Sequence, residues 1–158
     1  MMIKVVEHEF AHVRPMEFRR TTDEIILHCT ATQCGRDYTV EDIDRWHKER
    51  GFNCIGYHFV IYRDGTVHRG RPMGAVGAHC QGHNSRSISV CYVGGCDKSG
   101  QPKDTRTDAQ KTALVETVKW LLSYYGLSIS DVHGHREFAA KACPSFDVKN
   151  FRASLLES

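Results

Sequence analysis

The chain lacks a long hydrophobic run, a strong charge of either sign and any low-complexity stretch. No run of about 18 apolar residues occurs in its 158 residues, which excludes a membrane span. The first nine residues contain no apolar core of signal-peptide length, so we expect the protein to be cytoplasmic as synthesised. The formal net charge is only +2, too small to provide the basic field that binding to nucleic acid requires.

Cysteine, by contrast, is plentiful but odd in number. Seven cysteines fit a reducing compartment better than a disulfide framework. The length fits one domain. A chain of this size buries roughly 68–70% of its unfolded surface, which is enough for a core without disulfides.

Hydrophobic patterning predicts a single α/β domain with a mixed central sheet flanked by helices. Short apolar runs predict strands over 24–29, 57–62, 66–71, 87–93 and 129–133, and helical spacing predicts helices over 39–50, 107–125 and 147–157. Capping-box patterns open the helices at Thr39 and Thr107, and Asp64-Gly65 predicts a hairpin turn. Residues 1–22 are interpreted as an N-terminal extension with an edge strand, and residues 23–158 as the domain.

Two histidines and a cysteine suggest a catalytic metal site. His135 and Cys143 lie eight residues apart, a spacing that lets an imidazole and a thiolate close on one zinc ion. His28 ends an apolar strand, Gly134 would let the backbone turn sharply, and Pro144 stiffens the chain beside the sulfur. Catalytic zinc commonly has three protein ligands and an open position, whereas structural zinc has four. The pattern predicts a zinc hydrolase with one Zn²⁺ per chain.

Simpler interpretations compete with this one. Taken alone, a strand histidine is commonly a packed core residue and a buried cysteine a small hydrophobe. The pairs Cys29/Cys34 and Cys91/Cys96 also allow a structural zinc knot. Against the knot, Cys29 and Cys91 lie inside predicted strands, where neighbouring side chains point to opposite faces. His58 is interpreted as a packed or hydrogen-bonded polar residue.

A family resemblance covers most of the chain. It is carried by segments 27–32, 43–49, 56–59, 63–67, 75–79, 87–95 and 141–147, in this order and spacing between Asp23 and Phe151. In these segments the chain resembles the zinc-dependent N-acetylmuramoyl-L-alanine amidases. The likeness is greatest to the phage lysozyme-type enzymes, and it extends to the peptidoglycan-recognition proteins. The resemblance implies their amidase/recognition-protein fold.

The resemblance also implies residue roles. His28, His135 and Cys143 would bind zinc, and Tyr57 and Lys141 would be the catalytic pair. The reaction would be hydrolysis of the amide bond between N-acetylmuramic acid and L-alanine in peptidoglycan, with zinc lowering the pKa of water from 15.7 to about 7. Lys141 would stabilise the developing oxyanion, an effect worth about 2.7–4 kcal/mol for one donor. Tyr57, with an unperturbed pKa of about 10, is expected to hydrogen-bond rather than to act as a free base.

His79 and Asn84 complete the expected site, because their family counterparts line the substrate groove; the simpler interpretation is a surface-loop histidine and a turn asparagine. The implied partners are peptidoglycan or muropeptides, with no nucleic acid, no membrane insertion and a monomeric state. Such an enzyme acts on the cell wall if it is released or exported.

Two other functions remain open on the same fold. One is a cytoplasmic amidase that recycles soluble muropeptides. The other is a non-catalytic peptidoglycan-binding module, but relatives of that kind commonly lack the thiolate ligand that Cys143 provides here.

Overall fold

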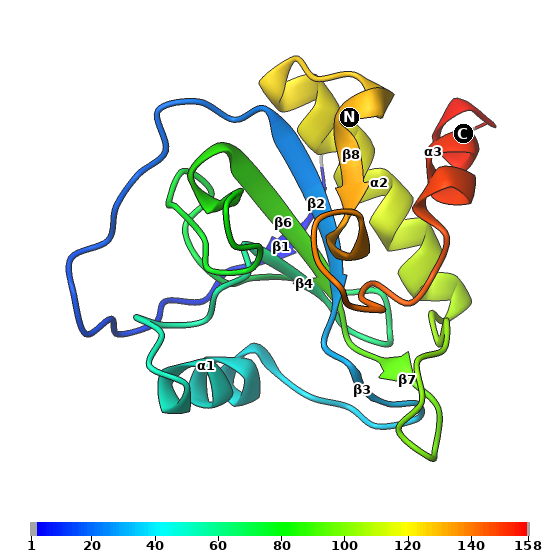
Figure 1. Cartoon of the computed structure of the whole chain (residues 1–158), viewed down its shortest axis with the longest axis horizontal. Helices are drawn as coiled ribbons and strands as arrows, with labels where there is room; N and C mark the ends of the chain where they lie inside the picture. Colours follow the sequence, from blue (N-terminus) through cyan, green and yellow to red (C-terminus); the bar gives the residue numbers. More distant parts are fainter. Residues whose placement is uncertain (1–2, 158) are drawn as a thin grey trace.

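A six-stranded mixed sheet with helices on both faces forms the protein (Figure 1), in a computed structural model that describes residues 3–157. The strands are β1 (Val5–Val6), β2 (Glu24–Cys29), β3 (Thr32–Gln33), β4 (Phe59–Ile61), β5 (Val67–Arg69), β6 (Ser87–Tyr92), β7 (Gly95–Cys96) and β8 (Val132–Gly134). The helices are α1 (Val40–Glu49), α2 (Asp108–Tyr125) and α3 (Val148–Glu157), with 3-10 turns η1 (Asn84–Arg86), η2 (Ile129–Asp131) and η3 (His135–Glu137). The predicted single α/β domain is confirmed.

Strand β2 lies inside the sheet, whose order is β1-β5-β4-β6-β2-β8. It runs parallel to β6 on one side and to β8 on the other, and β4 is parallel to β6. The predicted hairpin is present as the antiparallel pair β4–β5, which makes the sheet mixed. Because parallel strands are buried on both faces, β2 is apolar along most of its length, and residues 25–29 are all buried.

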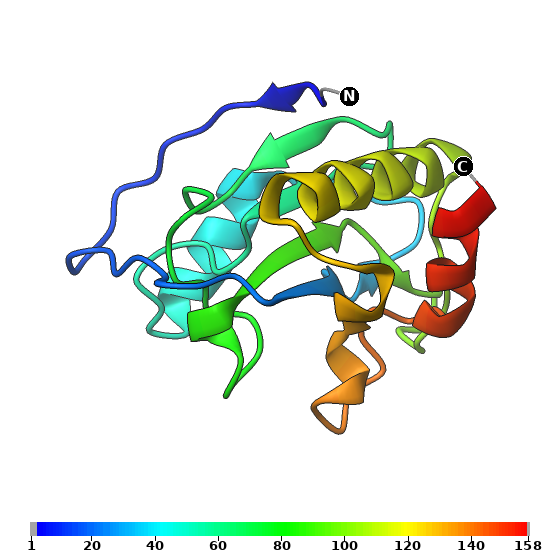
Figure 2. The same ribbon diagram turned by 90° about the horizontal axis from the view of Figure 1, so that it is seen from above.

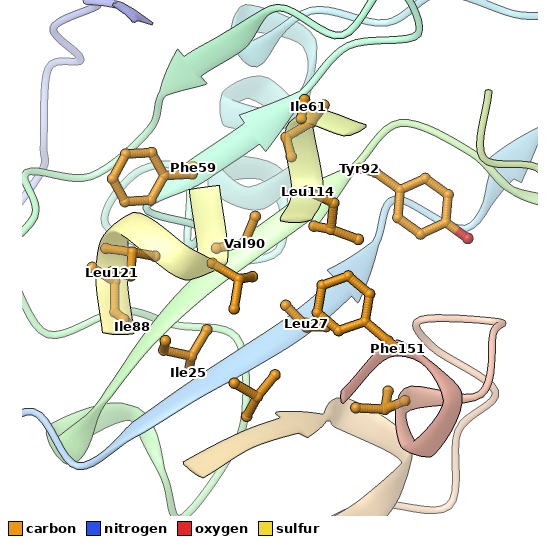
Figure 3. Packing of buried hydrophobic residues seen from close by; sticks show 14 of the residues in the cluster. Ile25, Leu27, Phe59, Ile61, Ile88, Val90, Tyr92, Leu114, Leu121 and Phe151 are labelled. Atoms are coloured by element: carbon orange, nitrogen blue, oxygen red, sulfur yellow. The ribbon is translucent and has the colours of Figure 1, made fainter. Parts of the chain in front are cut away.

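The two faces of the sheet carry separate cores. Ile25 and Leu27 pack with Val90 against Leu114 and Leu121 of α2 (Figure 3); α3 adds its apolar side chains to the same cluster. The opposite face is covered by α1 (Figure 1) through a smaller cluster of buried residues: Val40, Ile43, Ile55, Val60, Cys91 and Val93. The alternation of β2 therefore sends Leu27 towards α2 and leaves its neighbour His28 for the other face.

Both predicted capping boxes are confirmed. The Thr39 side chain accepts a hydrogen bond from the amide of Asp42, whose carboxylate accepts one from the amide of Thr39. Thr107 and Gln110 form the same reciprocal pair at the start of α2, which ends at Gly126 in the left-handed conformation (φ 67°). These hydrogen bonds satisfy amide groups that have no partner within the helix.

Two predictions of local structure were incomplete. The strand predicted over 129–133 is a 3-10 turn up to Asp131, and the extended segment is Val132–Gly134. Ser128 and Asp131 form a capping box that favours the turn over a strand. The small parallel pair β3–β7 was not predicted, because two-residue strands such as Thr32–Gln33 are too short for a periodic pattern.

The N-terminal segment runs along the outside of the molecule (Figure 2). Its predicted edge strand is confirmed, since Val5 and Val6 pair with β5 at the end of the sheet. Further along, Phe18 forms an isolated bridge with Ala75, and the Arg19 guanidinium donates to the carbonyl groups of Met73 and Ala75. The division into an extension (1–22) and a domain (23–158) stays a prediction, and Met1–Met2 lie outside the described residues.

In the part of the chain that the structure describes, no helix combines the length and the hydrophobicity needed to cross a membrane.

We predict that Thr107→Ala destabilises the protein by about 0.5–2 kcal/mol, the usual loss for an N-cap. The hydroxyl of Thr107 accepts from the amide of Gln110 and also donates to the Arg63 carbonyl at 2.7 Å. Urea unfolding would measure the change in free energy, with the exposed Thr112→Ala in the same helix as the matched control. Equal stabilities of the two variants would contradict the cap assignment.

Candidate metal centre

Three potential metal ligands from separate segments meet beside β2. One ligand atom each from His28 in β2, His135 in η3 and Cys143 in the following loop lie within 4.8 Å of one another. Among residues 3–157 this is the only group of three or more His, Cys, Asp or Glu side chains with such spacing. The structure thus brings together the three residues predicted as ligands, and it assembles no four-cysteine knot from the described residues.

A hydrogen bond closes the loop that carries His135 and Cys143. The amide of Arg136 donates to the carbonyl of Cys143 at 2.8 Å, so the eight-residue separation in sequence becomes a short distance in space. The loop projects from the body of the protein between β8 and α3 (Figure 2). Its ends are therefore fixed even though its tip lies at the surface.

Gly134 is needed before His135 for a reason different from the predicted sharp turn. Its backbone is extended, with φ −101° and ψ 150°, a conformation open to any residue. A Cβ atom at this position, however, would lie 2.6 Å from Val148 Cγ2 and 3.0 Å from Pro144 Cδ. Glycine therefore permits close packing of β8 against the ligand loop and the start of α3.

The two ring nitrogens of His28 face different partners. Its Nδ1 lies 3.6 Å from Cys143 Sγ, whereas its Nε2 lies 2.9 Å from Nδ1 of His79. The His28 and His135 rings are 4.7 Å apart. Burial and then the neighbouring His135 hold the pKa of His28 well below its ordinary value, so the imidazole is neutral and keeps a lone pair for a cation.

Cys143 lies at the end of strand β2, next to Cys29. The amide of Cys29 donates to Cys143 Sγ at 3.2 Å, which favours negative charge on the sulfur. The Cys29 side chain, together with burial, raises the pKa of the Cys143 thiol. A dication beside the sulfur would reverse that shift, because thiols that coordinate a metal are deprotonated.

Tyr57 and Lys141, the predicted catalytic pair, border the same pocket. The Tyr57 ring lies 5.2 Å from the rings of both His28 and His47. Burial, followed by the nearby Cys91 thiol, raises the pKa of Tyr57 well above its ordinary value, so its hydroxyl is neutral and keeps its proton. Lys141 is exposed on the ligand loop, and its positive charge lowers the pKa of His135, for which burial is the larger cause.

The pocket beside this centre has a volume of about 560 Å³. It is lined by the end of α1 and the residues after it, by the loop before β6 and by the ligand loop: His47, Arg50, Phe52, Tyr57, Ala78, His79, Cys80, Gln81, Asn84, His135, Phe138, Ala139 and Lys141. Arg50 and Lys141 give its rim two positive charges, and none of these lining residues is acidic. Its electrostatics therefore favour a substrate that carries carboxylates.

His79 and Asn84 line the pocket, although their hydrogen bonds point into the protein. Asn84 Oδ1 accepts from the amides of both His79 and Cys80 at 2.9 Å and so holds their loop. Their predicted contact with substrate stays a prediction. His58 is fully buried and bonded to Ser89 and the Ala75 carbonyl, which confirms its interpretation as a satisfied polar residue.

His47 is a pocket residue that the sequence analysis did not single out. Its Nδ1 accepts from the amide of Gly56 at 2.8 Å, and Asp44, one turn earlier in α1, accepts from the amide of Ile55. Burial lowers the pKa of His47 to about 4, so it is neutral. Two buried polar residues on an otherwise apolar helix face were the available signal.

Two histidines and a cysteine beside an open pocket are an arrangement typical of metallohydrolases, and similarity to known proteins identifies which kind. The chain belongs to the N-acetylmuramoyl-L-alanine amidase family, whose model matches residues 18–146. It is an N-acetylmuramoyl-L-alanine amidase that acts on peptidoglycan. The predicted family and enzyme class are thereby confirmed.

Phage enzymes are similar to this chain along most of its length. The endolysins of Klebsiella phage KP32 and Escherichia phage T7 are each 45% identical over 133 residues, which cover 84% of this chain and 87% of theirs. Among solved structures, the amidase LysC from Clostridium intestinale superposes with a TM-score of 0.85 at 30% identity and covers 98% of both chains. Drosophila peptidoglycan recognition protein SD, at 18% identity and a TM-score of 0.77, covers 90% of this chain and 89% of its own and shares the fold.

We predict that Asn84→Ala loosens the pocket loop (residues 70–83, between β5 and η1), since it leaves the amides of His79 and Cys80 without an acceptor. Each such loss costs about 1–3 kcal/mol when the group remains buried. Hydrogen exchange at these two amides should accelerate in the alanine variant. Asn84→Asp, which keeps an acceptor oxygen, is the control; indistinguishable exchange in the two variants would contradict the assignment.

Proposed function

We propose that the amidase is zinc-dependent and that His28, His135 and Cys143 hold one Zn²⁺ per chain. The observation that carries the proposal is their convergence within 4.8 Å beside a pocket. The reaction is hydrolysis of the amide bond between N-acetylmuramic acid and L-alanine. The activity of the family supports this bond as the target.

The donor set fits zinc better than other common metals. Two imidazoles and a thiolate form a borderline-soft set that suits Zn²⁺, whereas Mg²⁺ and Ca²⁺ prefer oxygen. Three protein ligands leave a fourth position for chemistry. The amide of Cys29, aimed at Cys143 Sγ, supports the thiolate form that coordination requires.

The chain's own groups complete the site. When bound, the metal supplies Lewis acidity and makes a water nucleophilic at neutral pH. The Tyr57 hydroxyl donates a hydrogen bond towards the substrate carbonyl or the attacking water, because its raised pKa keeps it protonated. The Lys141 ammonium stabilises the negative charge that develops on the carbonyl oxygen. Both residues line the pocket.

The substrate is a muropeptide unit within peptidoglycan. Its peptide stem carries carboxylates, which complement Arg50 and Lys141 at the rim. A mutant of Drosophila PGRP-LB, a protein that shares the fold, has been solved in complex with tracheal cytotoxin. We include His79 and Asn84 in this groove, and we propose a monomer that acts on the cell wall after release, in keeping with relatives named endolysins.

Digestion of purified peptidoglycan tests the reaction. New alanine amino termini and new reducing sugar ends would be counted in one sample, with and without a chelator. We expect amino termini alone, lost on chelation and restored by zinc. Reducing ends would indicate a glycosidase and overturn the proposal. Faster turnover of soluble muropeptides than of intact sacculi would favour a recycling role instead.

We predict that Cys143→Ser loses zinc and activity together, because a neutral hydroxyl replaces a thiolate ligand poorly. Bound metal is measured by atomic absorption after gel filtration. Cys54→Ser is the control, since Cys54 is buried outside both the ligand group and the pocket lining. Full activity of zinc-loaded Cys143→Ser would refute the assignment of this ligand.

Lys141→Ala should keep its zinc and lose most of its turnover. Removal of one oxyanion donor commonly lowers kcat by about 10²–10³-fold. The exposed Lys149→Ala, a lysine of α3 outside the pocket lining, is the matched control for the loss of one charge. Loss of metal from Lys141→Ala would show that this lysine supports the structure of the loop instead.

A further inference from the structure

A line of hydrogen bonds leads away from His28 on the side opposite to Cys143. His28 Nε2 lies 2.9 Å from His79 Nδ1. On the far side of its ring, His79 Nε2 lies 3.3 Å from Ser87 Oγ, and that hydroxyl donates to the carbonyl of His83 at 2.7 Å. Four residues from β2, β6 and the pocket loop thus form one connected chain.

The carbonyl of His83, at the end of this series of hydrogen bonds, fixes the direction of each of them. A carbonyl only accepts, so the Ser87 hydroxyl must donate to it and offer its lone pair to His79. His79 Nε2 therefore carries hydrogen, which leaves His79 Nδ1 as an acceptor in the neutral ring. His28 Nε2 then carries hydrogen, and its lone pair is on Nδ1, the nitrogen that faces Cys143.

We propose that His79 is a positioning residue that fixes the tautomer and the ring orientation of His28, so that Nδ1 is presented to the metal. The inference rests on the proposed zinc site and assigns a role within it. Groups that hydrogen-bond a ligand imidazole in this way raise its basicity and orient it. Both ring nitrogens of His79 are occupied by protein partners, so His79 lines the groove without offering a free ring nitrogen to a substrate.

Hydrogen bonds and close packing around His79 restrict the position of its ring. Asn84 holds its amide, and the amide of Ala78 donates to the carbonyl of Gly56. A Cβ atom on Gly77 would lie 2.6 Å from His79 Cδ2 and 2.9 Å from His58 Cε1, so glycine is required for this packing. Beneath the loop, the Arg71 guanidinium donates to the carbonyls of Val76 and Ile55.

Two amide variants separate this role from the alternatives. In His79→Asn the side-chain oxygen can occupy the place of Nδ1 and accept from His28. In His79→Gln the longer amide reaches towards Ser87 instead and leaves His28 without that acceptor. The exposed His12→Gln is the control for a histidine-to-glutamine change. The zinc Kd of each protein is measured by competition with a chromophoric chelator, and KM and kcat are measured on muropeptide at saturating zinc.

We expect His79→Asn to bind zinc within about 3-fold of the wild type, and His79→Gln to bind it about 10–100-fold more weakly, with little change in KM. The cobalt-substituted enzyme should show altered visible absorption bands in the glutamine variant alone.

Equal zinc Kd values for the two variants would overturn the proposal. A raised KM with unchanged zinc Kd would overturn it in favour of direct contact between His79 and substrate. A wild-type protein that binds no zinc would refute the proposed function and this inference together, whereas bound zinc with equal variants refutes this inference alone.

Discussion

The burial of β2 between two parallel strands is the constraint on which the rest of the structure depends. A central parallel strand must be apolar on both faces, yet β2 carries His28, which is 1% exposed, near its end. A buried imidazole is tolerated when it is neutral and hydrogen-bonded. His79 provides that hydrogen bond on one side, and the other side is left to Cys143 and His135. The one buried histidine of β2, His28, therefore provides the point around which His135 and Cys143 gather.

The same strand also positions the sulfur. Cys29 is the last residue of β2, and its amide donates a hydrogen bond to Cys143 Sγ. The backbone of the sheet therefore fixes the position of the sulfur relative to β2. The Arg136–Cys143 hydrogen bond then closes the ligand loop at its base. His28 is held by β2 and His135 by η3, Cys143 lies in the loop closed at its base, and Lys141 near the tip of that loop is exposed. The three candidate ligands therefore converge beside β2, and Lys141 lies on the pocket wall.

Local sequence signals were sufficient for most elements, whereas the convergence of His28 with His135 and Cys143 was predicted from their spacing together with the family resemblance. Capping residues marked the starts of α1 and α2, and the run 24–29 marked β2, because each signal lies within a few neighbouring residues. The β3–β7 pair and the reason for Gly134 were not accessible, since they depend on contacts between distant segments. His79 shows the same limit: the family resemblance implied a place in the site, but its hydrogen-bond partner His28 is 51 residues away in sequence.

The pocket loop shows how such distant contacts are maintained. It has no regular secondary structure before η1, so its shape cannot come from repeated backbone hydrogen bonds. Two guanidinium groups replace them: half-buried Arg19 donates to Met73 and Ala75, and buried Arg71 donates to Val76. Each charged donor is worth more than a neutral one, and the planar fork binds two carbonyls at once. Arg19 lies in the N-terminal segment before β2. Its hydrogen bonds therefore connect that segment to the pocket loop beside the candidate metal centre.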